Sequence, residues 1–91
     1  MLNAMRERAE TMIRVRVRLF ATLRAYRPGL AMGESVPVEV EQGATVRDLL
    51  ASLGVPAGEV KLIFANGLSR DLEHVLADGD DLGIFPPVGG G

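Results

Sequence analysis

Hydrophobic and polar residues alternate most regularly between residues 13 and 20. Aliphatic side chains take every second position and arginines fill the gaps: Ile13, Val15, Val17 and Leu19 against Arg14, Arg16 and Arg18. A period of two places successive side chains on opposite faces, so the spacing predicts a strand with one buried face. The alternation recurs in the valines at 36, 38 and 40, where Pro37 predicts an edge strand because it lacks a backbone amide. We expect an antiparallel hairpin whose long loop holds one helical turn at Thr22–Tyr26.

A helical period follows, with signals for both of its ends. The apolar residues have the i, i+3, i+4, i+7 spacing of an amphipathic helix: Val46, Leu49, Leu50 and Leu53. Thr45 is a good N-cap, and Asp48 at the third helical position makes a variant of the capping box. Gly54 is expected to end the helix in the left-handed conformation.

The remainder of the chain predicts three more strands and little helix. A strand over 61–65 ends in an Asn66–Gly67 turn signal, and a short strand follows over 68–72. Residues 73–77 are interpreted as one helical turn that leads into a tight turn at 78–80. The last strand, over 82–86, is expected beside the first.

With one main helix for a mixed sheet of four to five strands, the pattern indicates a two-layer α+β fold with the helix on one face. We divide the chain into an N-terminal extension (1–11), one folded domain (12–88) and a glycine tail (89–91). The extension is interpreted as frayed or helical and receives no function, because Met12 is itself a sensible translation start.

Composition narrows the chemistry that the chain can perform. The 91 residues contain no cysteine and a single histidine, His74. The sequence therefore predicts no disulfide, no thiolate nucleophile, no metal site and no bound cofactor. The apolar runs are too short to span a bilayer and no signal peptide is visible, so a cytoplasmic location is expected.

The net charge of −2 is unevenly distributed along the sequence. Basic residues without acidic neighbours lie near the front: Arg14, Arg16, Arg18, Arg24 and Arg27. Acidic residues lie near the back: Asp71, Glu73, Asp78, Asp80 and Asp81. Opposite patches suit a protein partner better than a nucleic acid, although both sets are equally consistent with solvated faces. We expect no nucleic-acid partner.

The final residues, "FPPVGGG", are the strongest candidate for a functional segment. Glycines lack a Cβ and can lie extended in a channel too narrow for side chains, while Pro86 and Pro87 stiffen the exit from the sheet. This pattern points to the terminal carboxylate of Gly91 as the reactive group. The alternative is an end without function, since glycine-rich ends are common in linkers.

Catalysis by the chain's own side chains is a weaker hypothesis. Ser69, Asp71 and His74 are close in sequence, but nothing in their spacing indicates a triad. His74 is interpreted as an exposed or helix-end residue. The aspartates around Gly79 are interpreted as a tight turn whose carboxylates bind backbone amides.

One apolar surface is predicted near the tail. A sheet covered by a single helix leaves its second face partly bare, so Ile63 and Phe85 are expected to form an exposed patch there, bordered by Phe20 and Arg24. The alternative is that one of them packs beneath the long loop or the N-terminal extension.

Three segments resemble the MoaD/ThiS sulfur-carrier family, and above all its MoaD branch. The end "LADGDDLGIFPPVGGG" is similar to the family pattern L-x-D-G-D-x-V-x-F-F-P-P-V-x-G-G. The front "IRVRVRLFATLRAY" resembles the opening strand with its F-A-x-x-R run, which falls on Phe20, Ala21 and Arg24. The helix start "ATVRDLL" resembles T-V-x-x-L. The chain departs from the family in three ways: at Gly83, at Ile84 in place of the first phenylalanine, and in the extension before Met12.

This resemblance implies a ubiquitin-like β-grasp fold and a carrier rather than an enzyme. An E1-like adenylyltransferase of the MoeB/ThiF type would use ATP to adenylate Gly91, with Gly90 completing the diglycine, and sulfur would then give a thiocarboxylate. The large subunit of molybdopterin synthase (MoaE type) would receive that sulfur in molybdenum-cofactor synthesis. Partner contacts would come from Phe85, Pro86, Pro87, Val88 and Gly89.

Two hypotheses about function remain open. The first is a sulfur carrier, for which the pathway is also open. Related carriers supply sulfur for thiamine, cysteine, tungsten cofactors or tRNA thiolation, and some archaeal relatives are joined to protein lysines; here Lys61 is the only lysine. The second reading is a non-covalent β-grasp interaction module that uses Arg14, Arg16, Arg18 or the Ile63/Phe85 surface.

Overall fold

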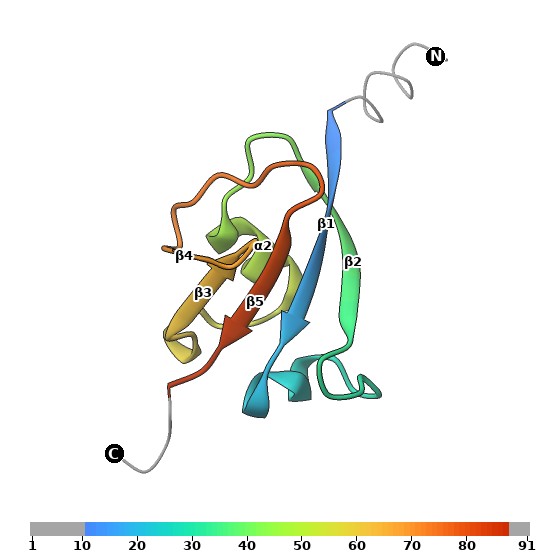
Figure 1. Ribbon diagram of the computed structural model, residues 1–91, viewed down its shortest axis with the longest axis vertical. Coiled ribbons are helices and arrows are strands. Elements are labelled where there is room, and N and C mark those ends of the chain that lie inside the picture. Colours follow the sequence, from blue (N-terminus) through green and yellow to red (C-terminus); the bar gives the residue numbers. More distant parts are fainter. Residues whose placement is uncertain (1–10, 88–91) are drawn as a thin grey trace.

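The computed structural model describes residues 11–87, which form a two-layer α+β domain (Figure 1). Five strands make one sheet: β1 (Met12–Leu19), β2 (Ser35–Glu41), β3 (Leu62–Ala65), β4 (Leu68–Arg70) and β5 (Asp81–Phe85). One α-helix, α2 (Val46–Leu53), and two 3₁₀ helices, η1 (Ala21–Tyr26) and η2 (Ala57–Glu59), complete the domain. No helix in this part of the chain is long and apolar enough to cross a membrane.

The strands are arranged in the order β2-β1-β5-β3-β4, so the first and last strands are the central pair. β1 and β5 run parallel, and the other neighbouring pairs run antiparallel. The predicted hairpin of the first two strands and the position of the last strand beside the first are confirmed. β2 is an edge strand, as Pro37 indicated.

The core lies between the sheet and α2, which covers one face (Figure 1). On each central strand, every second side chain points into the core. Four of these side chains are fully buried: Val15 and Val17 on β1, and Leu82 and Ile84 on β5. The helix contributes Val46, Leu49 and Leu50, each no more than 1% exposed. Burial of these aliphatic side chains provides the main stabilisation of a domain with few aromatic residues.

Both predicted helix ends are confirmed. The Thr45 hydroxyl accepts from the backbone amide of Asp48 (3.2 Å), and the Asp48 carboxylate accepts from the amide of Thr45 (2.9 Å). Gly54 follows the helix with φ of 74°, a left-handed conformation that favours glycine.

The predicted helical turn at 73–77 is wrong, because this segment binds α2 instead of itself. The first amides of a helix have no partner within it. Here the amide of Val46 donates to the carbonyl of His74 (3.0 Å), and that of Arg47 donates to Leu72 (2.9 Å). Val75 also forms an isolated bridge with Thr45. The segment therefore stays non-helical, with the carbonyl of His74 and that of the preceding Leu72 bound to the start of the helix.

Thr45→Ala is expected to lower the free energy of unfolding by about 1 kcal/mol, because the capping hydroxyl is lost. Urea unfolding followed by circular dichroism measures the change. Thr45→Ser keeps the hydroxyl and is the matched control, expected to stay close to the parent. Equal losses in the two variants would contradict a capping role for the hydroxyl.

Candidate functional site

The residues that precede the glycine tail in sequence lie at the end of a central strand. β5 ends at Phe85, and the half-buried Pro86 and exposed Pro87 follow it. These prolines line a shallow pocket of about 460 Å³ against η1 and η2. The Tyr26 hydroxyl donates to Glu59 across that pocket and joins the two short helices. This bond is the main cause that raises the pKa of Tyr26. The predictions for Val88, Gly89, Gly90 and Gly91 concern positions outside the described residues.

Three phenylalanines gather on the sheet face opposite α2, and we call them the aromatic plate: Phe20, Phe64 and Phe85. The rings of Phe20 and Phe85 stack with centroids 4.2 Å apart and planes 1° from parallel. Phe64 meets Phe85 edge to face, with centroids 5.8 Å apart. All three side chains are only half-buried. An apolar surface therefore lies directly beside the base of the tail.

The prediction that Ile63 shares an exposed surface with Phe85 is wrong. In the register of β3 and β5, Ile63 lies opposite Ile84, whereas Phe85 lies opposite Leu62. Ile63 is 4% exposed and belongs to the core. The plate takes its β3 member from Phe64, one residue later. The alternation of 62–65 allows either Ile63 or Phe64 to lie on the exposed face. The register between β3 and β5 decides between them, and the sequence does not predict that register.

Phe20 is in the predicted neighbourhood, directly after β1. Its amide donates to the carbonyl of Ile84 (3.1 Å), which ties the end of β1 to β5. Arg24 lies on η1 and is half-buried. In Figure 1, η1 (cyan) lies at the same end of the sheet as the C-terminal end of β5. Arg24 therefore belongs to the end of the domain from which the tail departs.

The arginines and acids that are separated in sequence meet in the fold. The parallel pairing of β1 with β5 places Arg16 opposite Asp81, and Arg18 forms an ion pair with the Asp81 carboxylate. The amide of Arg14 donates to Asp78 (2.9 Å), and its guanidinium binds Glu39 (2.9 Å). The two sets therefore do not form separate patches, because Asp81 of the second set pairs with Arg18 of the first, and Asp78 binds the backbone of Arg14.

The hydrogen bond from Arg18 is the main cause that lowers the pKa of Asp81, and the positive charges of Arg18 and Arg16 add to it. A lowered pKa in the folded state means that Asp81 stabilises the fold above its unfolded pKa of about 4. This contribution to stability is lost as the pH falls through the lower pKa that Asp81 has in the folded state.

Asp81→Asn is therefore expected to be less stable than the parent at neutral pH, and the difference should close as the pH falls below about 4. Because the pair is partly exposed, the difference should be small and should shrink in high salt. Urea unfolding at several pH values measures it. A difference that persists unchanged in strong acid would contradict this account.

His74 lies near Ser69 and Asp71, but the three do not make a catalytic arrangement. They line one shallow pocket with Arg70, of about 410 Å³. The Asp71 carboxylate accepts from the amide of Glu73 (2.9 Å), and His74 Nε2 points to Asp80, 3.6 Å away. The imidazole is mostly buried, so the prediction of an exposed or helix-end histidine is wrong. No group of three or more potential metal ligands occurs among residues 11–87.

The aspartates around Gly79 form the predicted tight turn. Asp78 accepts from the amide of Arg14, and Asp80 accepts from the amide of Ala77 (2.9 Å) and from the side chain of Asn66 (2.9 Å). These carboxylates are thus used to fix the turn before β5.

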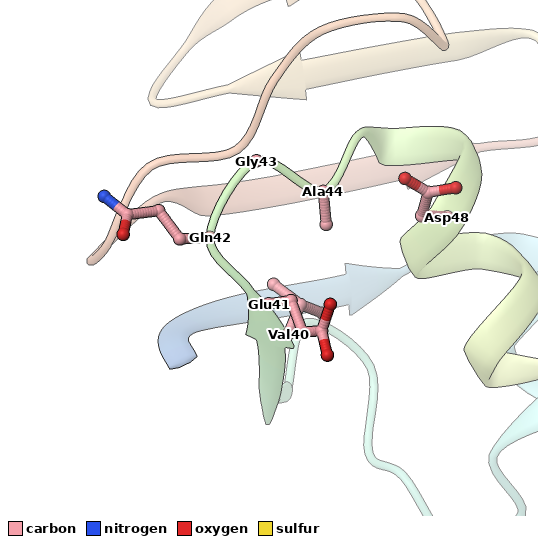
Figure 2. Close-up of a pocket in the computed structure, with 6 residues that line it drawn as sticks. All are labelled: Val40, Glu41, Gln42, Gly43, Ala44 and Asp48. Atoms are coloured by element: carbon pink, nitrogen blue, oxygen red, sulfur yellow. The ribbon is translucent and has the colours of Figure 1, made fainter. Parts of the chain in front are cut away.

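Another pocket, of about 410 Å³, lies where β2 turns into α2 (Figure 2). Figure 2 shows Gln42 pointing away from Asp48, across the turn that contains Gly43 and Ala44. The Asp48 carboxylate already accepts from the amide of Thr45. The polar side chains of this pocket do not converge on one point. It is therefore a weaker candidate for a functional site than the aromatic plate.

A mixed sheet in this order, covered on one face by a single α-helix, defines a ubiquitin-like β-grasp fold. The chain belongs to the Mut7-C ubiquitin family, whose model matches residues 12–89. No curated protein matches the sequence significantly.

Solved structures agree with this assignment. The solution structure of the Haloferax volcanii HVO 2177 protein is 32% identical, with a TM-score of 0.69 and 89% of each chain covered. SAMP1 from Haloferax volcanii is 29% identical, with a TM-score of 0.64 over 86% of this chain and 99% of SAMP1. A putative molybdopterin converting factor, subunit 1, from Pyrococcus furiosus is 28% identical, with a TM-score of 0.64 over 84% and 99%. The chain is therefore a ubiquitin-fold protein of the MoaD/ThiS type.

Proposed function

We propose that this protein is a sulfur carrier whose Gly91 carboxylate is adenylated and then converted to a thiocarboxylate. The observation that carries the proposal is the likeness, over most of the chain, to a molybdopterin converting factor subunit and to SAMP1, combined with a sequence that continues from Phe85 of the aromatic plate through two prolines to three glycines. In this role the chain is a substrate and subunit, and its partners supply the catalytic groups.

The chemistry requires such partners. A terminal carboxylate with a pKa near 3.5 is ionised at neutral pH and is a poor electrophile. In the proposed reaction its oxygen attacks the α-phosphorus of ATP, and pyrophosphate leaves. A sulfide-level donor then attacks the acyl carbon, and AMP leaves with the original carboxylate oxygen. The chain contains no cysteine, so the sulfur must come from elsewhere.

An E1-like adenylyltransferase of the MoeB/ThiF type is the proposed first partner. It would bind the end of the domain that carries Phe20, Arg24 and Phe85, and it would receive the segment from Pro86 through Gly90 in its channel. The large subunit of a molybdopterin synthase (MoaE type) is the proposed sulfur acceptor. Other sulfur-transfer pathways are the alternative for this second partner.

A second candidate function is protein modification, which the likeness to SAMP1, a small archaeal modifier protein, favours. In that case an amine of another protein would displace AMP and form an amide with Gly91. Both functions share the adenylate and differ in the nucleophile that follows.

Adenylation tests the shared step. The E1-like adenylyltransferase from the same source is incubated with ATP and the full chain, and pyrophosphate release is measured. We expect release that depends on the chain. An enzyme that adenylates another carrier but releases no pyrophosphate with this chain would contradict the proposal. Adding sulfide or a lysine-rich acceptor then distinguishes the carrier from the modifier.

A further inference from the structure

The last strand is held from both sides at the point where it ends. On one side, the amide of Phe20 donates to the carbonyl of Ile84 (3.1 Å), and η1 begins at the residue after Phe20. On the other side, the amide of Lys61 donates to the carbonyl of Phe85 (2.8 Å), and η2 ends two residues before Lys61. The two short helices therefore flank the end of β5, although they are far apart in the sequence.

A hydrogen bond between two side chains joins these helices, and we call its two members the clasp: Tyr26 and Glu59. Tyr26 is the last residue of η1, and it packs against the hydrophobic core. Glu59 is the last residue of η2, and its amide closes that turn by donating to the carbonyl of Pro56 (3.0 Å). Each partner is thus fixed by its own surroundings, and the bond connects two positions that are held independently.

The clasp and the residues that follow β5 face the same hollow. Pro86 and Pro87 line it together with residues of both helices, among them Tyr26 and Glu59. A proline has its φ fixed near −65°, so fewer rotations are free at this point than in an ordinary segment. The walls of the hollow limit the rotations that remain. Two walls that are tied together restrict the prolines more than two walls that move separately.

We propose that Tyr26 and Glu59 are positioning residues, whose hydrogen bond holds the walls of this hollow in place and so directs Pro86 and Pro87 towards the adenylating site. The inference rests on the proposed function. The clasp would act within the chain itself, before the enzyme binds. A segment that already has its bound direction loses less conformational freedom on binding, which strengthens association. The bond should therefore lower the KM for the chain and leave the chemical step unaltered.

Tyr26→Phe tests this role, because it removes the hydroxyl and keeps the ring on the core. Pyrophosphate release is measured against the concentration of the chain. One such hydrogen bond changes an equilibrium by up to about tenfold, so we expect KM to rise about three- to tenfold with kcat unchanged. Glu59→Gln keeps an oxygen that accepts from the hydroxyl and should stay within about twofold of the parent. Thr22→Val removes another hydroxyl from the same hollow and should change neither constant.

A double-mutant cycle separates positioning from direct contact with the enzyme. If the two side chains act through their mutual bond, Tyr26→Phe and Glu59→Ala should raise KM to a similar extent, and the double variant should be no worse than either. Thermal unfolding of every variant shows whether the fold is retained. Additive effects on KM would indicate two independent contacts and would overturn the inference.

The clasp can also be observed without the enzyme. Tyr26 is the only tyrosine, and the chain has no tryptophan, so ultraviolet absorbance during a pH titration reports Tyr26 alone. The hydrogen bond to Glu59 is the main cause that raises the pKa of Tyr26, so the parent should titrate above about 10 and Glu59→Ala closer to 10. Identical titrations of the two chains would show that the bond does not form in solution, which would also overturn the inference.

The kinetic results distinguish this inference from the proposed function. A Tyr26→Phe chain with the KM of the parent would overturn the positioning role and leave the proposed function intact. A parent chain that is not adenylated at all would overturn both.

Discussion

Deleting Gly91 is expected to abolish adenylation while leaving the fold unchanged. The deletion shortens the tail by about 3.5 Å, so the new carboxylate at Gly90 would fall short of the α-phosphate in the enzyme's channel. Misplacement by even 1 Å can cost about 100-fold in rate, and the expected loss is at least that large. Pyrophosphate release measures it, and thermal unfolding should match the parent because the change lies beyond Pro87.

Two further variants separate length from bulk. One alanine added after Gly91 keeps the diglycine but displaces the carboxylate, and it should be as inactive as the deletion. Gly91→Ala keeps the length and adds only a Cβ, so it should retain more activity than either. A deletion variant that is adenylated at the parental rate would place the reactive group elsewhere.

Ile84→Ala is expected to lower the free energy of unfolding by about 2–5 kcal/mol, the range for removing a fully buried aliphatic side chain. Ile84 is 0% exposed on a central strand, and it lies between Leu19 on β1 and Ile63 on β3. Urea unfolding measures the loss. Because small domains have only modest total stability, this variant should be partly unfolded at moderate temperature.

Leu62→Ala is the matched control for this prediction. Leu62 is 41% exposed on the opposite face of β3, so its truncation should change stability by no more than about 0.5 kcal/mol. Equal effects at Ile84 and Leu62 would contradict the assignment of the two faces.

Features that depend on neighbouring residues were predictable from the sequence. The alternation of 13–20 determines which face of β1 is buried, because the strand period is two wherever that strand pairs. The ends of α2 were also predictable, since Thr45, Asp48 and Gly54 act within a few residues of one another. The resemblance at both ends of the chain indicated the β-grasp fold before the strand order was known.

Features that depend on pairing between distant segments were not predictable. The buried face of 62–65 is decided by its register with β5, so Ile63 could not be distinguished from Phe64. The charge pattern separated Arg18 from Asp81 by 62 intervening residues, yet the parallel β1–β5 pair joins them. Residues 73–77 have no apolar period of their own to show that the carbonyl of His74 accepts from the first amide of α2.

The candidate site divides in the same way. The tail was visible as glycines after two prolines. Phe85, with Phe20 and Arg24 at its border, was predicted from the sheet face that a single helix leaves bare, and the resemblance also placed Phe85 at a partner interface. Phe64 was not predicted, because it becomes part of the plate only when β3 is placed beside β5. Adjacent strands thus created a surface that the order of residues along the chain did not reveal.

The central claim is that the Gly91 carboxylate accepts sulfur, and the intact mass of the chain tests it most directly. The full chain is incubated with the E1-like adenylyltransferase, ATP and a sulfide donor, beside the Gly91 deletion. The account predicts a mass increase equal to the exchange of one oxygen for one sulfur, dependent on ATP and absent from the deletion variant. An unchanged mass, with an enzyme that thiolates another carrier under the same conditions, would contradict it.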